Sequence, residues 1–351
     1  MKRTNYQCQM SNEGRISRIV DANVNRAVEG LRVVEELVRF ILENKKLTDQ
    51  IKALRAQIRR GRTGLKVRSS ETDVGRKLYH TTEAARETLL DIFTANIKRA
   101  QEALRVLEEY SKLVSPRYGA VYKAIRFKLY DLEKKIYYPL LRQTKLDFDL
   151  YFITDPMRNH LDVARQAIQG GIKIIQLRDK MADQKDLLCW AKQIRKMTAR
   201  AGLTFIINDY VDIAQKVGAD GVHVGQDEKM SVREIRRKLG EDKIVGVSVQ
   251  NLKQAREAEK AGADYVGMGP VFSTPIKPDV KPLGLNLLRK MVQEVKIPVV
   301  AIGGIDQTNI DRILSTGCRR VAVIRALLVA RDMDRAVCRL RKRIFQGSGP
   351  D

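Results

Sequence analysis

The spacing of hydrophobic positions changes near residue 145, which divides the chain into two parts. Up to that point apolar side chains recur at helical spacing, which predicts helices over residues 14–43, 46–60, 74–113 and 117–142. From about Asp149, short β-branched runs alternate with amphipathic segments. These runs predict strands at 149–154, 172–177, 204–207, 220–224, 243–248, 264–268, 298–302 and 319–324. We therefore expect an all-helical domain over 1–145 and an α/β domain over 149–345.

The second domain has eight predicted strands, each followed by a helix. This regular alternation within roughly 200 residues predicts a closed (β/α)8 TIM barrel. An open doubly wound sheet is the competing fold, but the even spacing of the units favours closure. In such barrels the residues at the carboxyl ends of the strands form the active site.

The helical part contains an internal repeat. Ala22–Glu36 matches Ala95–Glu109, and the second copy follows the first by 73 residues (Asn23 to Asn96). A repeat of this kind predicts a duplicated helical hairpin with a pseudo-twofold axis. Each copy carries Glu, Arg and Glu at helical spacing, which is typical of a solvated helix face. Asn is a poor helix former, and for the duplicated Asn a structural role is favoured over binding.

Composition excludes several classes of protein. No apolar run is long enough to span a membrane, and the first fifteen residues lack the apolar core of a secretory signal, so we expect a cytoplasmic protein. The four cysteines lack metal-ligand spacing. The net charge of +24 suits phosphorylated substrates, whereas aromatic residues make up only 6%, which disfavours nucleic acid binding. The Gly/Arg/Ser/Asp-rich segment 61–75 is a weak phosphate-binding signal, because it lacks the Walker pattern.

Polar side chains follow several predicted strands. Arg178 and Lys180 occupy alternate positions after the second strand, so both can face the same way and hold a phosphate chain. Asp209 follows the third strand and Glu228 follows the fourth. Carboxylates at adjacent strand ends, with phosphate and water oxygens, are the ligands that Mg²⁺ requires. The sequence therefore predicts a cationic site with a bound magnesium ion.

A second anion site is expected at the last two strands. Gly303-Gly304 follows the seventh strand and Arg325 follows the eighth, where such barrels commonly seat a phosphate group. Two phosphorylated small-molecule substrates follow from two anion sites. His223 is expected to pack on the fourth strand rather than to catalyse.

These segments together resemble the thiamine phosphate synthase family over residues 149 to about 330. The resemblance rests on ordered motifs, namely Tyr-Phe-Ile-Thr-Asp at 151–155, Gln-Leu-Arg-x-Lys at 176–180, Asn-Asp at 208–209, His-x-Gly-Gln at 223–226, Gly-Val-Ser at 246–248, Gly-Pro-Val-Phe-x-Thr-x-x-Lys at 269–277 and Ile-Gly-Gly-Ile at 302–305. It implies a transferase that joins hydroxymethylpyrimidine diphosphate to thiazole phosphate and releases diphosphate.

The resemblance also implies roles for individual residues. The pyrimidine diphosphate would be held by Gln176, Leu177, Arg178, Asp179, Lys180, Asn208, Ser248 and Lys277. The thiazole phosphate would be held by Thr274, Pro275, Ile276, Gly304, Ile324 and Arg325. Asp209 and Glu228 would bind Mg²⁺, and Arg178, Lys180 and Lys277 would be the catalytic cations.

Three positions depart from the family pattern. Glu228 stands where Asp is usual, so either its longer side chain or the neighbouring Asp227 would bind the metal. Ile276 replaces a usual Thr and removes a hydroxyl from the thiazole phosphate site. Arg325 replaces a usual Ser and can compensate with its charge.

The helical part resembles the ThiD2 module that precedes some members of this family, which implies an ATP-dependent hydroxymethylpyrimidine phosphate kinase. One alternative keeps the barrel but makes it a thiazole tautomerase. Another makes the helical part an RNA-binding or dimerisation module. The oligomeric state stays open, a homo-oligomer included.

Overall fold

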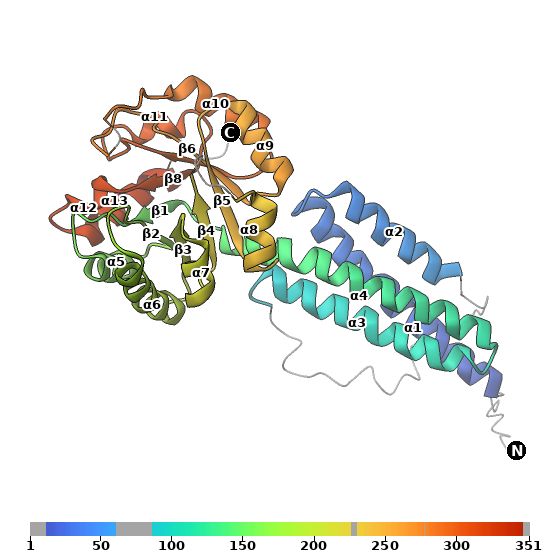
Figure 1. Ribbon diagram of the computed structural model, residues 1–351. Helices are drawn as coiled ribbons and strands as arrows, with labels where there is room; N and C mark the ends of the chain where they lie inside the picture. Colours follow the sequence, from blue (N-terminus) through green and yellow to red (C-terminus); the bar gives the residue numbers. More distant parts are fainter. Residues whose placement is uncertain (1–11, 61–85, 226–229, 277, 347–351) are drawn as a thin grey trace, which may run out of the picture. The chain divides into compact units, whose positions relative to one another are not determined.

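The structure is a computed structural model that describes residues 12–60, 86–225, 230–276 and 278–346 (Figure 1). The chain divides into two compact units, Met1–Thr144 and Lys145–Asp351. No helix among the described residues has the length and apolar character needed to cross a membrane.

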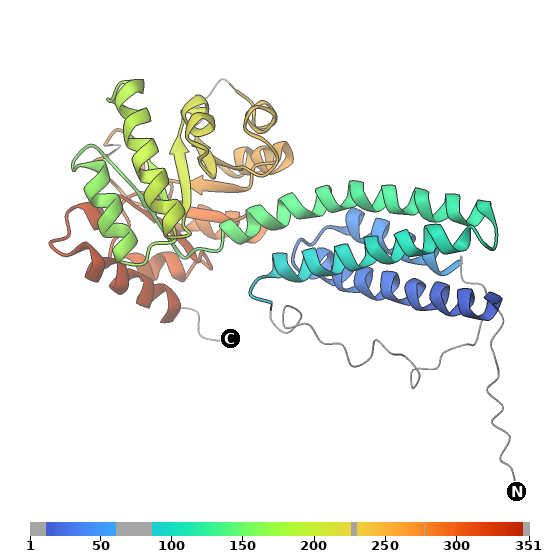
Figure 2. The same ribbon diagram turned by 90° about the horizontal axis from the view of Figure 1, so that it is seen from below.

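The described part of the first unit is built from four long helices that lie side by side (Figures 1 and 2). They are α1 (Asn12–Phe40), α2 (Lys45–Arg60), α3 (Leu89–Ser111) and α4 (Pro116–Lys145). All four contribute to one buried core, for example through Leu31, Ile51, Leu104 and Ile136, each of which is fully buried. Helix α1 packs along α3 so closely that a Cβ on Gly30 would come within 2.8 Å of the Asn96 carbonyl oxygen.

The repeat places equivalent ion pairs in the two hairpins. Glu35 of α1 is paired with Arg55 of α2, and Glu108 of α3 is paired with Arg126 of α4 at 2.8 Å. Both glutamates are buried, so the repeat contains more than the solvated face expected from the sequence. The matching ion pairs agree with a duplicated hairpin.

The repeated asparagines have local structural contacts. Asn23 donates to the Ile19 carbonyl and Asn96 donates to the Ile92 carbonyl, each at 2.8 Å and each within its own helix. These contacts agree with the structural role favoured by the sequence.

The third helix begins later than predicted. The predicted range 74–113 starts among residues outside the described part, but residues 86–88 are described and are not helical. Helix α3 begins at Leu89 because Thr88 caps it: the Thr88 hydroxyl accepts from the Asp91 backbone, and the Asp91 carboxylate accepts from the Thr88 backbone. This reciprocal capping box satisfies amide groups that the first helical turn leaves without partners.

The second unit is a closed barrel of eight parallel strands, in the order β1 to β8, which confirms the predicted fold. The strands are β1 (Leu150–Ile153), β2 (Ile174–Leu177), β3 (Thr204–Asn208), β4 (Gly221–Val224), β5 (Ile244–Val249), β6 (Tyr265–Met268), β7 (Val299–Ile302) and β8 (Arg320–Val323). Strand β1 pairs with both β2 and β8, which closes the ring.

Helices surround the barrel (Figure 1). They are α5 (His160–Gln169), α6 (Gln184–Arg200), α7 (Val211–Val217), α8 (Val232–Leu239), α9 (Leu252–Ala261), α10 (Gly284–Glu294), α11 (Ile310–Leu314), α12 (Arg325–Leu328) and α13 (Met333–Gln346). Their apolar faces cover the outward-facing side chains of the strands and form the main core of this unit.

The inward-facing side chains form a smaller core inside the barrel, which includes Tyr151, Ile206 and Tyr265. Gly246 on β5 makes room for the Tyr265 ring, because a Cβ at that glycine would come within 2.1 Å of the ring. These side chains therefore fill the middle of the barrel, and the open space lies at the carboxyl ends of the strands.

Candidate active site

A cavity of about 660 Å³ lies at the carboxyl ends of the strands. Side chains from β1 to β8 and from the loops that follow several of the strands line it, as the barrel topology requires. Cations, amides and two carboxylates, Asp209 and Asp306, line this space together.

Two of the cations come from the end of β2. Gln176, Arg178 and Lys180 line the cavity, whereas Leu177 and Asp179 do not. Successive side chains of a strand point to opposite sides, and Leu177 accordingly packs in the core between strands and helices. The Arg178 guanidinium lies 3.2 Å from an oxygen of Asp155. Lys180 is exposed at the cavity edge.

Asp209 presents a carboxylate to the cavity from an unusual backbone conformation. Its φ of +62° is a left-handed value that Asp tolerates better than most side chains. One carboxylate oxygen accepts from the Gly225 amide at 3.1 Å, and the other accepts from the Asn208 side chain at 2.6 Å. A residue held in such a conformation directly after a strand is a candidate for function.

A chain of hydrogen bonds forms the floor of the cavity. The Gln176 amide donates to the Tyr151 hydroxyl at 2.8 Å, and the Tyr151 and Tyr265 hydroxyls lie 3.0 Å apart. His223 bridges Tyr265 and Ser248, with its Nδ1 3.0 Å from the tyrosine oxygen and its Nε2 2.9 Å from the serine oxygen. Burial raises the pKa of both tyrosines, so their hydroxyls stay protonated at neutral pH.

Loops after β6, β7 and β8 form the side of the cavity that lies across from Arg178 and Lys180. Thr274, Pro275 and Ile276 line it together with Gly304 and Arg325. Gly304 has φ +66°, and a Cβ there would come within 2.4 Å of the Ser273 carbonyl oxygen. Only glycine fits this close approach of two loops.

The cavity brings together most of the residues predicted to bind substrate. They are Gln176, Arg178, Lys180, Asn208, Asp209, Ser248, Thr274, Pro275, Ile276, Gly304, Ile324 and Arg325. Lys277, Asp227 and Glu228 lie outside the described residues. Asp179 is buried away from the cavity and bonds to His160.

Three residues on the floor are among the cavity residues for which the sequence predicted no binding role. Tyr151, His223 and Tyr265 line the floor, and His223 contacts Ser248 as well as packing on β4. The alternation of inward and outward positions along each strand was the signal that could have identified them, because all three share the inward phase of their strands.

Asp209, the predicted metal ligand, and Asp306 are the described carboxylates that line the cavity. No group of three or more His, Cys, Asp or Glu residues within the described ranges could hold a metal ion. A single carboxylate still fits Mg²⁺, which commonly takes one or two protein carboxylates and completes its shell with phosphate and water oxygens.

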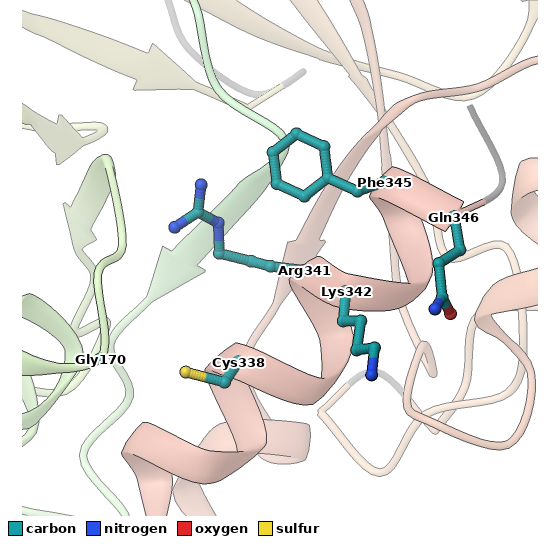
Figure 3. Close-up of a pocket in the computed structure, with 6 residues that line it drawn as sticks. All are labelled: Gly170, Cys338, Arg341, Lys342, Phe345 and Gln346. Carbon is teal, nitrogen blue, oxygen red and sulfur yellow. The ribbon is translucent and has the colours of Figure 1, made fainter. Parts of the chain in front are cut away.

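A second hollow lies on α13, away from the carboxyl ends of the strands (Figure 3). Gly170 and one face of the helix line it, including Cys338, Arg341 and Phe345. The Arg341 guanidinium is already bound to Asp149 at 2.9 Å, and it lies over the Phe345 ring. This hollow lacks the convergent polar groups that mark the barrel mouth.

The fold and the cations that line its cavity are those of a barrel enzyme. Residues 150–327 match the model of the TMP-TENI family, described as thiamine monophosphate synthase, and residues 18–135 match the ThiD2 family. The chain belongs to the thiamine-phosphate synthase family and is a transferase of that family.

Relatives match along nearly the whole chain. A thiamine-phosphate synthase of Synechocystis sp. is 40% identical over 336 residues, which cover 95% of this chain and 97% of the relative. The thiamine-phosphate synthase of Thermosynechococcus vestitus is also 40% identical, with 95% and 96% covered. A solved structure, the thiamine phosphate pyrophosphorylase from Pyrococcus furiosus, has a TM-score of 0.55 and 39% identity. It covers 59% of this chain and 100% of its own.

Proposed function

We propose that the barrel joins hydroxymethylpyrimidine diphosphate to thiazole phosphate, which gives thiamine phosphate and releases diphosphate. The observation that carries this proposal is the convergence of Arg178, Lys180 and Asp209 on one cavity in a chain of this family. A tautomerase would not need this arrangement, because it has no diphosphate to release.

Arg178 and Lys180 would bind the diphosphate of the first substrate. Arg178 is half-buried and its guanidinium is oriented by Asp155, whereas Lys180 is exposed and can follow the leaving group. Fixed positive charge stabilises the negative charge that grows on a departing diphosphate, and it is more effective where water is partly excluded. Lys277, outside the described residues, would supply a third cation.

Asp209 would bind Mg²⁺ together with oxygens of the diphosphate. Glu228 or Asp227, both outside the described residues, would supply the second carboxylate. The ion, when bound, neutralises charge on the leaving group. Asn208 holds one oxygen of Asp209 and the Gly225 amide holds the other, so the carboxylate is oriented before substrate arrives.

The floor residues would bind the pyrimidine ring. Gln176 and Ser248 stand at the two ends of the hydrogen-bond chain through Tyr151, Tyr265 and His223. This chain fixes the orientation of both end groups. Polar groups with fixed orientation favour a ligand whose donors and acceptors match them.

The second substrate would lie on the other side of the cavity. The loop at Thr274, the glycine at 304 and the guanidinium of Arg325 are the groups available for its phosphate. Arg325 is exposed, so its charge can approach a phosphate without the cost of burying an unpaired ion.

The chemistry follows from this arrangement. The bond between the pyrimidine methylene and the diphosphate oxygen breaks, and the diphosphate leaves with the electron pair. The electron-rich pyrimidine carries the positive charge, and the lone pair of the thiazole nitrogen forms the new bond to the methylene carbon. The protein supplies no nucleophile. It orients the two substrates and neutralises the leaving group.

The reaction itself tests the proposal. Purified full-length protein, Mg²⁺ and both substrates should give thiamine phosphate and diphosphate in equal amounts. Omission of either substrate should abolish both products. Failure of the complete mixture to form thiamine phosphate would rule the proposal out.

We also propose that the helical unit phosphorylates hydroxymethylpyrimidine phosphate with ATP, because residues 18–135 match the ThiD2 family. The terminal phosphoryl group of ATP would pass to the phosphate of the pyrimidine, which gives the diphosphate that the barrel consumes and leaves ADP. The two units would then catalyse consecutive reactions. The segment 61–75, suggested by sequence as a phosphate loop, lies outside the described residues.

The full chain allows this second activity to be isolated. In an Arg178→Ala variant, pyrimidine monophosphate, ATP, thiazole phosphate and Mg²⁺ should yield accumulating pyrimidine diphosphate, because the second step is slowed. The same mixture with wild-type protein should yield thiamine phosphate. If neither mixture formed ADP or pyrimidine diphosphate, the kinase proposal would be refuted and the synthase proposal would stand.

A further inference from the structure

His160 is a buried histidine that lies outside the cavity and has both ring nitrogens engaged. It is the first residue of α5, and the Asn159 side chain fixes that start by accepting from the Leu161 and Asp162 amides. The His160 Nδ1 lies 2.9 Å from the Thr154 hydroxyl and its Nε2 lies 3.0 Å from an Asp179 oxygen. Only 3% of the residue is exposed.

Thr154 and Asp179, the two partners of His160, both form hydrogen bonds to residues 178–182, the segment that carries Arg178 and Lys180. The second oxygen of Asp179 accepts from the amides of Met181 and Ala182 at 2.8 and 3.0 Å, which closes a turn around Lys180. The Thr154 hydroxyl accepts from the Arg178 amide at 3.1 Å. His160 therefore joins the end of β1 to both sides of the cation-bearing segment.

The group of His160, Thr154 and Asp179, here called the latch, is shielded from solvent. All three residues are buried, and the Trp190 ring packs against His160 with ring centroids 4.7 Å apart. Burial raises the pKa of the Asp179 carboxyl, but the hydrogen bonds from His160 and from the turn outweigh it, so its pKa is lowered. Asp179 is thus a fixed carboxylate at neutral pH.

A purely structural role would not require these particular partners. Buried polar groups must be hydrogen-bonded, and an apolar side chain at position 160 would fill the same space without that requirement. Here every polar contact of the imidazole leads to the backbone or the turn that carries Arg178 and Lys180. The cations themselves project into the cavity on the other side of the strand.

We propose that His160 is a positioning residue for the diphosphate site, which holds Arg178 and Lys180 in place through Thr154 and Asp179. This inference rests on the proposed function of the barrel. Loss of the latch should weaken contacts to the diphosphate and leave the thiazole phosphate side, formed by the loops after β6 to β8, unaffected.

Three substitutions separate the two halves of the latch. His160→Gln can place an amide near the position of Nε2 and keep the bond to Asp179. His160→Asn can place one near Nδ1 and keep only the bond to Thr154, and His160→Ala keeps neither. Because the Asp179 turn carries Lys180, KM for pyrimidine diphosphate should rise least in the Gln variant. It should rise by about tenfold or more in the Ala variant, since small displacements of positioning groups have large effects.

Val163→Ala is the matched control. Val163 is fully buried in the same helix, so its truncation destabilises the barrel without removing a latch contact. The KM for thiazole phosphate should stay at the wild-type value in all four variants. Folding is monitored by circular dichroism, because the fluorescence of Trp190, the single tryptophan of the chain, would respond directly to loss of the His160 ring.

A binding measurement separates this inference from the proposed reaction. Calorimetric titration with inorganic diphosphate and Mg²⁺ should show weaker binding in the Ala and Asn variants than in the Gln variant. Equal affinity in wild type and all His160 variants would overturn the latch. The latch would also be overturned if the KM values for pyrimidine diphosphate and for thiazole phosphate rose equally, both in His160→Ala and in Val163→Ala. If wild type makes no thiamine phosphate, the proposed function fails, while the affinity comparison still decides the latch.

Discussion

At the scale of single residues, the buried tyrosines Tyr122 and Tyr265 differ in the hydrogen-bond partners of their hydroxyl groups. The Tyr265 hydroxyl lies 3.0 Å from both Tyr151 and His223. The Tyr122 hydroxyl, in the core of the helical unit, has no hydrogen-bond partner among the described residues. Burial raises the pKa of Tyr122 to about 12, so this hydroxyl is neutral at physiological pH.

The same substitution should therefore have opposite effects at the two sites. Tyr122→Phe removes an unsatisfied buried group and should stabilise the helical unit by about 1 kcal/mol. Tyr265→Phe removes a partner from both Tyr151 and His223 and should destabilise the barrel by about 1–2 kcal/mol. Urea unfolding, followed by circular dichroism and by Trp190 fluorescence, measures both changes. A loss of stability in Tyr122→Phe equal to that in Tyr265→Phe would contradict this account.

The sequence predicted the kinds of side chain at the carboxyl ends of the strands, but not which residues of the run 176–180 line the cavity. Alternation along a strand places Arg178 and Lys180 on one side, and the same rule places Leu177 and Asp179 on the other. The resemblance to a family transferred the run 176–180 as a block and so included both outward-facing residues. The latch at His160 depends on a contact between segments 19 residues apart, which no local pattern reveals.

At the scale of elements, short-range patterns located the strands well. All eight observed strands lie within two residues of their predicted bounds, because β-branched runs flanked by polar loops are a strong local signal. The predicted start of α3 was wrong, although the Thr88-x-x-Asp91 capping signal was present in the sequence. The burial of Glu35 and Glu108 was missed because helical periodicity alone does not show which charged residue faces a neighbouring helix.

The buried ion pair between α3 and α4 should stabilise the helical unit strongly. Only 4% of the Glu108 side chain is exposed, and it is paired with Arg126, of which 14% is exposed. Glu108→Gln would leave this arginine without an opposite charge and should cost about 3 kcal/mol of unfolding free energy.

Glu109→Gln is the control for this substitution. Glu109 is the adjacent residue on the same helix, and 45% of its side chain is exposed, so its pairs with Arg105 and Lys112 should contribute little to stability. Urea unfolding followed by circular dichroism compares the two variants. Equal effects in both would show that the buried pair is no more important than the exposed one.

At the scale of the whole molecule, the chain consists of two units with separate cores, and each matches a different family. The proposed activities are consecutive, because the product of the helical unit would be a substrate of the barrel. The change of hydrophobic period near residue 145 predicted this division from sequence. The net charge of +24 suits phosphorylated substrates, but it does not by itself locate a site.

The central claim is that cations at the mouth of the barrel make departure of the diphosphate possible. Its most direct test is the rate of thiamine phosphate formation at saturating substrates in wild type, Arg178→Ala and Arg165→Ala. Arg165 is an exposed arginine of α5 that pairs only with Asp162 on the surface among the described residues. Arg178→Ala should lower the rate by about 10²-fold or more, and Arg165→Ala should leave it unchanged. A wild-type rate in Arg178→Ala would contradict the account.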